Sequence, residues 1–240
     1  MKICVIHLDD LSSCIVATSI NKALRSKYKD AEIVWITNND ISKQILRYSK
    51  LINNTLDPKD INSSIECDIL INLSPSFHPS DPLIAAKETV GFGFDSRSSE
   101  FYGILFNSKK TEMSEFQVYY RLAGLKWKGE GYGLHYYPKT RERKNRAGIA
   151  ISHPKLRDYV EKNLDLNGFK VVSLPYRHNI FKRMDEINSC EHIITEDKLT
   201  MHLSIYLRKY VHMLQIYEHS TRLEFFGNGR SYNVPTRFIA

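Results

Sequence analysis

Short apolar runs alternate with helix-like stretches through the first half of the chain. Residues 3–7 (ICVIH) form the kind of run expected for a parallel strand that is covered on both faces. Over residues 14–28, apolar side chains recur three or four positions apart, which predicts an amphipathic helix. The alternation continues with strands predicted over residues 31–37 and 68–73 and a helix over residues 41–48.

The alternation ends with a short helix predicted over residues 83–87 and a strand over residues 89–92. The stretch from residue 95 to residue 137 is less regular. Glycine, aromatic and lysine residues then alternate closely from residue 95 to residue 137. This pattern fits either a lobe edge with exposed aromatic side chains or a surface that cradles an acceptor molecule, and it leaves both interpretations open.

A strongly basic segment, KTRERKNR at residues 139–146, precedes a second series of alternating elements. Repeated strand–helix units imply a parallel sheet with right-handed crossovers. The chain is therefore predicted to be an α/β protein of two Rossmann-like lobes, residues 1–138 and 139–240, with parallel sheets and a cleft between them. Strands are predicted over residues 147–151, 169–174, 192–195 and 210–216, and helices over residues 154–166, 179–189, 198–207 and 221–226.

Composition places the chain among ordinary globular proteins. It has 240 residues, of which 42% are hydrophobic and 25% charged. No apolar run reaches the roughly 18 residues that a membrane span needs, and the first residues, MKICVIHLDD, turn acidic too early for a signal peptide. These features predict a cytoplasmic protein, in which the four cysteines, none in a CxxC spacing, are free thiols.

The formal net charge of +7 favours anionic partners such as nucleotides or phosphorylated sugars. Part of the charge lies in residues 139–146, which read most simply as a solvated linker. No helix-turn-helix, RNP or zinc-finger pattern is present, so nucleic-acid binding is not predicted. The sequence also lacks GxGxxG, P-loop and DxD motifs, which argues against a dinucleotide fold, a P-loop kinase and a metal-dependent transferase.

The predicted fold class indicates where a ligand-binding site lies. In open parallel sheets, ligands bind outside the carboxyl ends of the strands, where helix N-termini offer N–H groups to phosphate. The candidate loops are residues 8–13, 74–80, 152–155, 175–179, 196–198 and 217–221.

Four stretches resemble glycosyltransferase family 9, the lipopolysaccharide heptosyltransferases. They are the opening MKICVIHLDDLSSCIVATSINKALRSKYKDAEIVWIT, then CDILINLSP with AAKETVGF, then ITEDKLTMHLSIYLRKYVHMLQIY, and finally STRLEFFGNGRSY. The third is similar to the family's sugar-nucleotide motif, an Asp followed five residues later by His. The resemblance implies a GT-B fold that binds a nucleotide-sugar mainly on the C-terminal lobe, with the acceptor facing the N-terminal lobe.

The resemblance also implies which residues meet the donor. Asp197 matches the acid that contacts sugar hydroxyls, and His202 matches the histidine of the same motif. Lys198 and Leu199 fall where the family's backbone N–H groups meet the diphosphate. Two further residues, Lys155 and the Glu224 of the closing motif, match other donor contacts. Alternative interpretations stay open, because Asp197 is also a good helix cap and His202 also fits a packed helix position.

One departure from the family concerns the catalytic base. The family carries Gly-Asp in the first loop, whereas this chain has Ser12-Ser13. Serine does not accept a proton near neutral pH without a helper. Asp10, the first choice, or Asp9 could take over from the same loop, with Ser13 beside them, unless both acids are merely solvated loop carboxylates. The chain is also short for the family, which suggests a trimmed acceptor lobe.

The resemblance therefore predicts an inverting, metal-independent glycosyl transfer that needs no bound cofactor. The donor is a nucleotide-diphospho-sugar, with an ADP-linked sugar such as heptose favoured, and the acceptor is a saccharide or lipid-linked hydroxyl. A peripheral contact with the anionic inner membrane is consistent with the positive charge. The main alternative is a non-catalytic nucleotide-sugar-binding or scaffold protein. A hydrolase is a third alternative, disfavoured by the absence of a GxSxG elbow.

Overall fold

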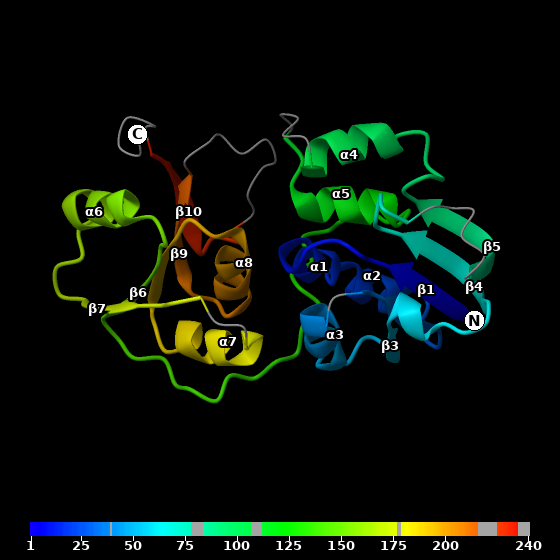
Figure 1. Ribbon diagram of the computed structural model, residues 1–240, viewed down its shortest axis with the longest axis horizontal. Helices are drawn as coiled ribbons and strands as arrows, with labels where there is room; N and C mark the ends of the chain where they lie inside the picture. Colours follow the sequence, from blue (N-terminus) through cyan, green and yellow to red (C-terminus); the bar gives the residue numbers. More distant parts are fainter. Residues whose placement is uncertain (39, 78–83, 107–111, 177–178, 216–224, 235–240) are drawn as a thin grey trace. The chain divides into compact units, whose positions relative to one another are not determined.

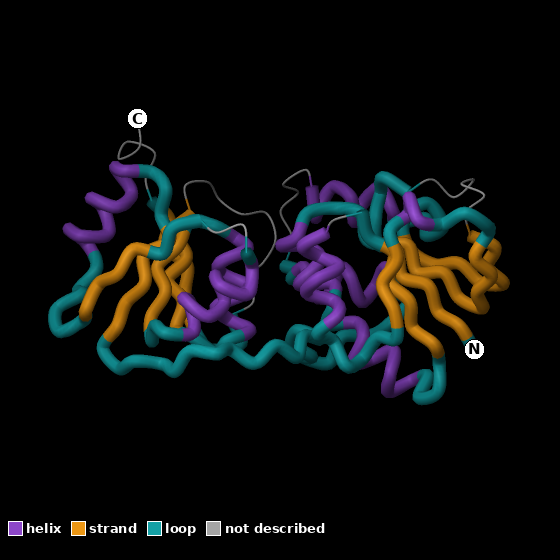
Figure 2. The backbone as a smooth tube through the Cα atoms, turned by 60° about the horizontal axis from the view of Figure 1, so that its bottom comes forward, coloured by secondary structure: helices purple, strands orange, loops and turns teal. Residues whose placement is uncertain are grey.

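The computed structural model describes residues 1–38, 40–77, 84–106, 112–176, 179–215 and 225–234, which form two compact units (Figure 1). Unit 1 holds the described residues up to Tyr136, and unit 2 begins at Tyr137. Each unit contains one parallel sheet with helices packed against it (Figure 2). The predicted α/β class with two Rossmann-like lobes is confirmed.

Unit 1 is built around a five-stranded parallel sheet of order β3-β2-β1-β4-β5. The register of its central strands pairs Val5 with both Trp35 and Ile71. Because side chains alternate between the faces of a strand, Cys4 and Ile6 lie on the opposite face to Val5, in an apolar cluster with residues of β2 and β4. The elements are β1 (Lys2–Ile6), α1 (Leu11–Ala17), α2 (Ile20–Lys27), β2 (Glu32–Ile36), α3 (Asp40–Arg47), β3 (Asn54–Leu56), a 3₁₀ turn (Pro58–Asp60), β4 (Ile65–Asn72), β5 (Ile84–Gly91), α4 (Ser98–Phe106) and α5 (Glu115–Leu122).

Three features of unit 1 differ from the prediction. The helix predicted over residues 83–87 is wrong, because residues 84–87 belong to β5, which pairs with β4. The single helix predicted over residues 14–28 is two helices, broken where the Thr18 hydroxyl donates to the Ile15 carbonyl and accepts the Gly133 N–H. The irregular stretch contains α4 and α5, and the latter starts with a capping box formed by Ser114 and Gln117.

Unit 2 also has a five-stranded parallel sheet, but its strand order is β10-β9-β8-β6-β7, so its first strand, β6, lies next to the edge, whereas the first strand of unit 1 lies at the centre. Ala150 at the end of β6 pairs with Thr195 at the end of β8. Helix α6 covers one face of the sheet, while α7 and α8 pack together on the other (Figure 1). The elements are β6 (Arg146–Ala150), α6 (Pro154–Asn163), β7 (Lys170–Ser173), α7 (Ile180–Asn188), β8 (His192–Thr195), α8 (Lys198–Tyr206), β9 (Tyr210–Gln215) and β10 (Gly229–Asn233). The helix predicted over residues 221–226 falls mostly outside the described residues.

The basic segment 139–146 is not a free linker. Its backbone is fixed to α7, because the Lys139 N–H donates to Asp185 Oδ1 at 2.7 Å and Asn188 donates to the Thr140 carbonyl at 2.7 Å. The buried ammonium group of Lys209 pairs with Glu142. The lysine and arginine side chains of residues 139–144 are exposed and Arg146 is half-buried, while the backbone of the segment belongs structurally to unit 2.

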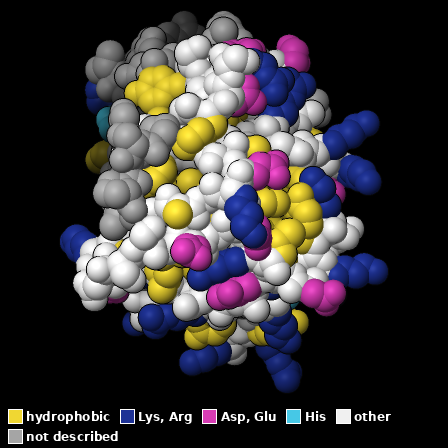
Figure 3. Space-filling view, turned by 90° about the vertical axis from the view of Figure 1, so that its right-hand side faces the viewer, with side chains coloured by type: hydrophobic (Ala, Val, Ile, Leu, Met, Phe, Trp, Pro, Cys, Tyr) yellow, Lys and Arg dark blue, Asp and Glu magenta, His cyan; other side chains and the backbone are white. Residues whose placement is uncertain are grey.

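Surface charge is mixed on the face of unit 1 drawn in Figure 3, where Lys and Arg side chains are interspersed with Asp and Glu. The net positive charge is therefore not gathered into one patch on this face. Among the described helices, none has the length and hydropathy that crossing a bilayer requires. All four cysteines are free, as predicted, and they are buried.

Candidate functional site

A pocket of about 440 Å³ lies at the carboxyl ends of the central strands of unit 2. Strand β6 connects to β7 on one side, and the chain then crosses to β8 on the other side, so the strand order reverses between β6 and β8. Such a switch point is where open α/β sheets bind ligands. The residues that follow β6, β7 and β8 line the pocket, together with Arg157 of α6 and Arg183 of α7.

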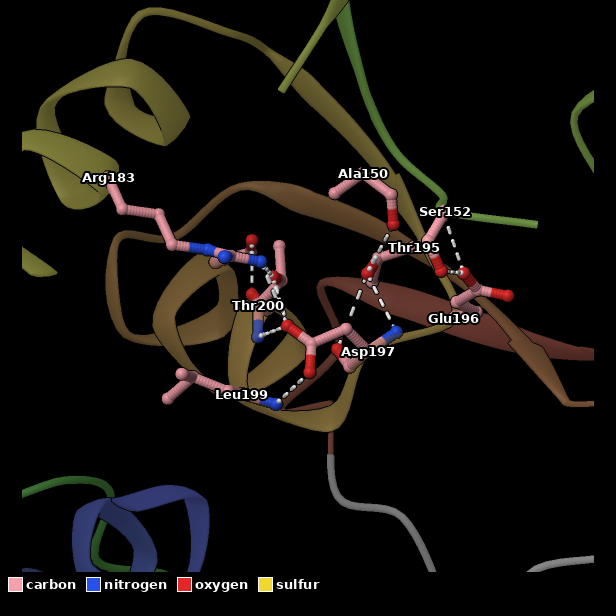
Figure 4. Close-up of polar contacts among 9 residues, drawn as sticks. Ala150, Ser152, Arg183, Thr195, Glu196, Asp197, Leu199 and Thr200 are labelled. Carbon is pink, nitrogen blue, oxygen red and sulfur yellow. Dashed lines mark hydrogen bonds and ion pairs between the residues drawn. The ribbon is translucent and has the colours of Figure 1, made fainter. Parts of the chain in front are cut away.

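Asp197 lines this pocket and caps α8 (Figure 4). Its carboxylate accepts hydrogen bonds from the backbone N–H groups of Leu199, at 3.4 Å, and Thr200, at 2.9 Å. The Arg183 guanidinium donates to the same carboxylate, with Nη2 2.9 Å from Oδ2. Asp197 therefore satisfies the first turn of its own helix, which was one of the two roles that the sequence left open.

The neighbouring acid, Glu196, reaches across to the start of α6 (Figure 4). Its Oε1 accepts the Ser152 N–H at 2.7 Å, the Ser152 hydroxyl at 2.6 Å and the His153 N–H at 3.3 Å. On α7, Asn179 accepts two N–H groups of the first turn. The N-termini of α7 and α8 are thus capped by side chains of unit 2, whereas the N-cap residue of α6, His153, makes no side-chain cap hydrogen bond.

Two guanidinium groups and one aromatic ring complete the pocket. The Arg183 side chain is only 6% exposed, whereas Tyr176 is 66% exposed and its ring centroid lies 5.1 Å from the guanidinium carbon of Arg183. Arg157 donates to the Ser173 hydroxyl at 3.3 Å. Sequence reasoning missed all three residues. The only local signal was that Tyr176 follows a strand, inside the candidate loop 175–179.

The other predicted donor residues lie around the pocket without lining it. Lys155 is exposed in the first turn of α6, and Lys198 and Leu199 are half-buried at the start of α8. His202 is 3% exposed, buried with the inner residues of α8. Glu224 falls outside the described residues. Of the predicted donor set, Asp197 is the residue that the structure brings to the pocket wall.

Unit 1 has an equivalent switch point, between β1 and β4, and Asp9 lies there. The Ser74 hydroxyl, just after β4, donates to Asp9 Oδ2 at 2.8 Å and accepts the Leu8 N–H at 2.6 Å. Burial raises the pKa of Asp9, as does the nearby charge of Asp10, and the hydrogen bond from Ser74 opposes them. A half-buried carboxylate with a raised pKa is a stronger base than a solvated one.

Asp10 has a different environment. It is exposed and caps α1, where it accepts the Ser13 N–H at 3.0 Å. The Ser13 hydroxyl donates to Asp10 as well, 2.8 Å from Oδ2. The three predicted catalytic residues, Asp9, Asp10 and Ser13, therefore share one loop, but Asp10 and Ser13 bond to each other and Asp9 bonds to Ser74.

A buried aromatic pair lies behind this loop. The His7 and Tyr119 side chains are fully buried, with ring centroids 5.9 Å apart. Burial lowers the pKa of His7 to about 4, although the charge of Asp10 opposes the shift. Burial likewise raises the pKa of the Tyr119 hydroxyl well above its usual value. Both rings are consequently neutral at pH 7. The charged side chains at the end of β1 are therefore those of Asp9 and Asp10.

The chemistry available in unit 2 is the binding of polar, anionic molecules. Carboxylates accept hydrogen bonds from sugar hydroxyls, guanidinium groups donate to phosphate oxygens, and an exposed tyrosine ring offers a stacking surface. Within the described ranges, no group of three or more His, Cys, Asp and Glu side chains could hold a metal ion.

Comparison with solved structures gives consistent matches over nearly the whole chain. A glycosyl transferase family 9 protein from Veillonella parvula superposes with a TM-score of 0.67 at 13% identity, covering 97% of this chain and 86% of that one. The ADP-heptose lps heptosyltransferase II of E. coli gives 0.63 at 13% identity, covering 98% and 91%. The E. coli heptosyltransferase WaaC, solved with ADP, gives 0.66 at 10% identity, covering 98% and 94%.

These matches concern the fold. No protein-family model and no curated protein sequence matches the chain. The fold is GT-B-like, as the resemblance to glycosyltransferase family 9 implied, with two parallel five-stranded sheets. The structure thus confirms the predicted fold class.

Proposed function

We propose that this protein transfers a sugar from a nucleotide-diphospho-sugar to a hydroxyl acceptor, with inversion and without a metal ion. The observation that carries the proposal is the 440 Å³ pocket at the switch point of unit 2, with its two carboxylates, two guanidinium groups and tyrosine ring. WaaC has been solved with ADP and with ADP-2-deoxy-2-fluoro heptose, which supports an ADP-linked donor, such as ADP-heptose, for this chain.

The donor occupies the pocket of unit 2 in this proposal. Glu196 and Asp197 accept hydrogen bonds from ribose or sugar hydroxyls, and Tyr176 stacks against a flat or apolar face of the donor. Lys198 and Lys155 act as point charges near the diphosphate, where they stabilise the leaving group as the bond to the sugar breaks.

The general base in this proposal is Asp9. Burial raises its pKa, which suits proton acceptance, and the hydrogen bond from Ser74 holds the carboxylate in position, while the Asp10 carboxylate is engaged at the start of α1. Asp9 takes the proton of the acceptor hydroxyl as that oxygen attacks the anomeric carbon. The acceptor is a saccharide or a lipid-linked sugar, reached at the inner face of the membrane.

Donor binding is tested by calorimetry. The wild-type protein is titrated with ADP-, GDP- and UDP-linked sugars, and the donor that binds is then titrated into Lys198→Ala. We expect weaker binding in that variant and unchanged binding in Lys162→Ala, which removes an exposed lysine from the last turn of α6. If no nucleotide-sugar binds the wild-type protein, the proposed function is wrong.

The base is tested by comparing two neighbouring substitutions. Asp9→Asn should lower turnover about 100-fold or more while leaving donor affinity unchanged, because general base catalysis contributes about 10²- to 10⁴-fold. Asp10→Asn should retain turnover, since asparagine is also a good helix cap. Turnover is measured as release of the nucleoside diphosphate in the presence of saccharide acceptors. An undiminished rate in Asp9→Asn would reject Asp9.

A second candidate is a non-catalytic protein that binds a nucleotide-sugar as a sensor or scaffold. The observation in its favour is the pair Ser12-Ser13, where the family has Gly-Asp, with the Ser13 hydroxyl hydrogen-bonded to Asp10. A product assay separates the candidates. Donor binding without sugar transfer to any acceptor supports the second, and a transferred sugar supports the first.

A further inference from the structure

The Arg183 side chain has an incomplete set of hydrogen bonds. Its Nη2 donates to Asp197 Oδ2 and to the Thr200 hydroxyl, whereas Nη1 is buried and has no hydrogen-bond partner among the described residues. Buried charged donors are almost always paired, because losing water without a replacement partner is unfavourable. An unpaired nitrogen on a 6% exposed guanidinium therefore indicates that something else pairs with it in function.

Arg183 also lies where a ligand can reach it. Together with Asp197 it lines the 440 Å³ pocket, and the Tyr176 ring lies over its guanidinium. Tyr176 is 66% exposed, so its ring can turn aside with little loss of packing. A ligand that enters the pocket and displaces this ring meets the unpaired edge of Arg183.

The ligand group that pairs with Arg183 is an anion. The Asp197 carboxylate already accepts the first N–H groups of α8, so the helix terminus offers fewer donors to a phosphate. A guanidinium is planar and always charged, and it can bind one acid along one edge and a phosphate oxygen along another. Two acids, Glu196 and Asp197, line the same pocket as Arg157 and Arg183.

We propose that Arg183 binds a phosphate of the nucleoside diphosphate through Nη1, while its Nη2 holds Asp197 at the start of α8. This inference rests on the proposed function and adds a residue that the family resemblance did not suggest. It makes the α7 guanidinium, rather than the α8 terminus alone, the anion receptor of unit 2.

The test separates the phosphates from the nucleoside. Calorimetric titrations compare ADP, or whichever nucleoside diphosphate the wild-type protein binds, with its nucleoside and with inorganic pyrophosphate. Arg183→Met should weaken diphosphate and pyrophosphate binding about 10- to 100-fold, as expected for a lost hydrogen bond to a charged group, and change nucleoside binding less than twofold. Lys182→Gln, which removes an exposed charge from the same helix, should change none of them more than twofold.

Each outcome has a defined meaning. Equal weakening of nucleoside and diphosphate in Arg183→Met, or no weakening, overturns the inference while leaving the proposed function intact. Failure of every nucleotide-sugar and nucleoside diphosphate to bind the wild-type protein overturns the proposed function instead. If thermal unfolding shows that Arg183→Met does not fold, Arg183→Lys replaces it. That variant keeps the positive charge but loses the planar guanidinium, which can bind one group along each of two edges. Undiminished pyrophosphate binding in it overturns the inference as well.

Discussion

Two pairs of adjacent acids occupy equivalent places in the two units. In each pair, the second acid caps the helix that follows it: Asp10 caps α1 and Asp197 caps α8. The first acid bonds instead to a serine beyond the neighbouring strand of the switch point, with Asp9 bonded to Ser74 and Glu196 to Ser152. Chemically similar carboxylates therefore have different roles because their hydrogen-bond partners differ. The first acid of each pair joins two loops of the switch point, and the second caps a helix.

His7 gives a prediction at the scale of one residue. Its pKa falls from 6.5 to about 4 on folding, so the unfolded chain binds a proton in this range that the folded chain does not. Unit 1 is then fully stable above about pH 6.5 and loses stability as the pH falls from there towards 4. At pH 5 this one group is expected to reduce the free energy of unfolding by about 2 kcal/mol.

The variant His7→Phe removes this proton linkage. The ring nitrogens of His7 have no hydrogen-bond partners among the described residues, so phenylalanine loses no contact and can still pack against Trp35 and Tyr119. Urea unfolding at pH 5 and pH 7, followed by tryptophan fluorescence, should show the variant's advantage growing as the pH falls. A constant difference between the two proteins at both pH values would contradict the assignment.

At the scale of elements, the end of β5 supports the loop that carries Asp9. A Cβ atom on Gly91, whose φ is +103°, would lie 2.0 Å from the Asn72 carbonyl oxygen at the end of β4. The Asn72 side chain accepts the Ser74 N–H at 3.0 Å and donates to the Phe92 carbonyl at 2.8 Å. The close approach of two strand ends thus sets the position of the serine that bonds to Asp9.

Gly91→Ala should therefore damage both stability and the candidate base. We expect it to lower the free energy of unfolding of unit 1 by about 3 kcal/mol or more, because backbone strain and a backbone clash add together. Gly124→Ala is the matched control: φ is +64°, but the nearest atom to a Cβ lies 4.0 Å away, so only about 1–2 kcal/mol of strain is expected. Equal losses in the two variants, measured by urea unfolding, would show that the clash is absorbed.

The elements also show what sequence patterns could and could not supply. Strands β1, β2, β6 and β8 were predicted within a residue or two, because buried parallel strands are continuous apolar runs. Residues 84–87 (IAAK) favour a helix by propensity, but pairing with β4 outweighs that preference. Helix α4 was missed because its sequence, SSEFYGILF, has apolar residues on every side and shows no amphipathic period.

Sequence patterns predicted only those contacts of the site that join residues close together in the chain. The cap formed by Asp197 was visible as one alternative, since an acid just before an apolar helix is a normal start signal. Its partner Arg183 was not visible, because the two residues lie 14 positions apart in the chain, and the contact of Glu196 with Ser152 joins residues 44 positions apart. The raised pKa of Asp9 likewise depends on burial in the folded unit, and its partner Ser74 is brought near only by the sheet.

At the scale of the whole molecule, the chain consists of two units that each carry a complete sheet and an apolar core. The chain's two tryptophans, Trp35 and Trp127, both belong to unit 1. Tryptophan fluorescence therefore follows the unfolding of unit 1, whereas far-UV circular dichroism follows the helices of both units. The proposed donor pocket lies in unit 2. Comparing the two signals therefore distinguishes the unfolding of the unit that binds the donor from the unfolding of the unit that carries the tryptophans.

A nucleoside diphosphate should consequently stabilise one part of the unfolding curve. At 100 times its Kd, a ligand that binds only the folded state adds about 2.7 kcal/mol to the free energy of unfolding of the unit that binds it. We expect the circular dichroism transition to shift to higher temperature in part, with a biphasic curve, while the tryptophan transition keeps its midpoint. At the same ligand concentration, Arg183→Met, with its 10- to 100-fold weaker binding, should gain only about 0.4–1.4 kcal/mol, so its circular dichroism transition should shift less than that of the wild-type protein. An equal shift of the two signals in the wild-type protein would instead mean that the units unfold as one cooperative body, and the tryptophans would then report binding as well.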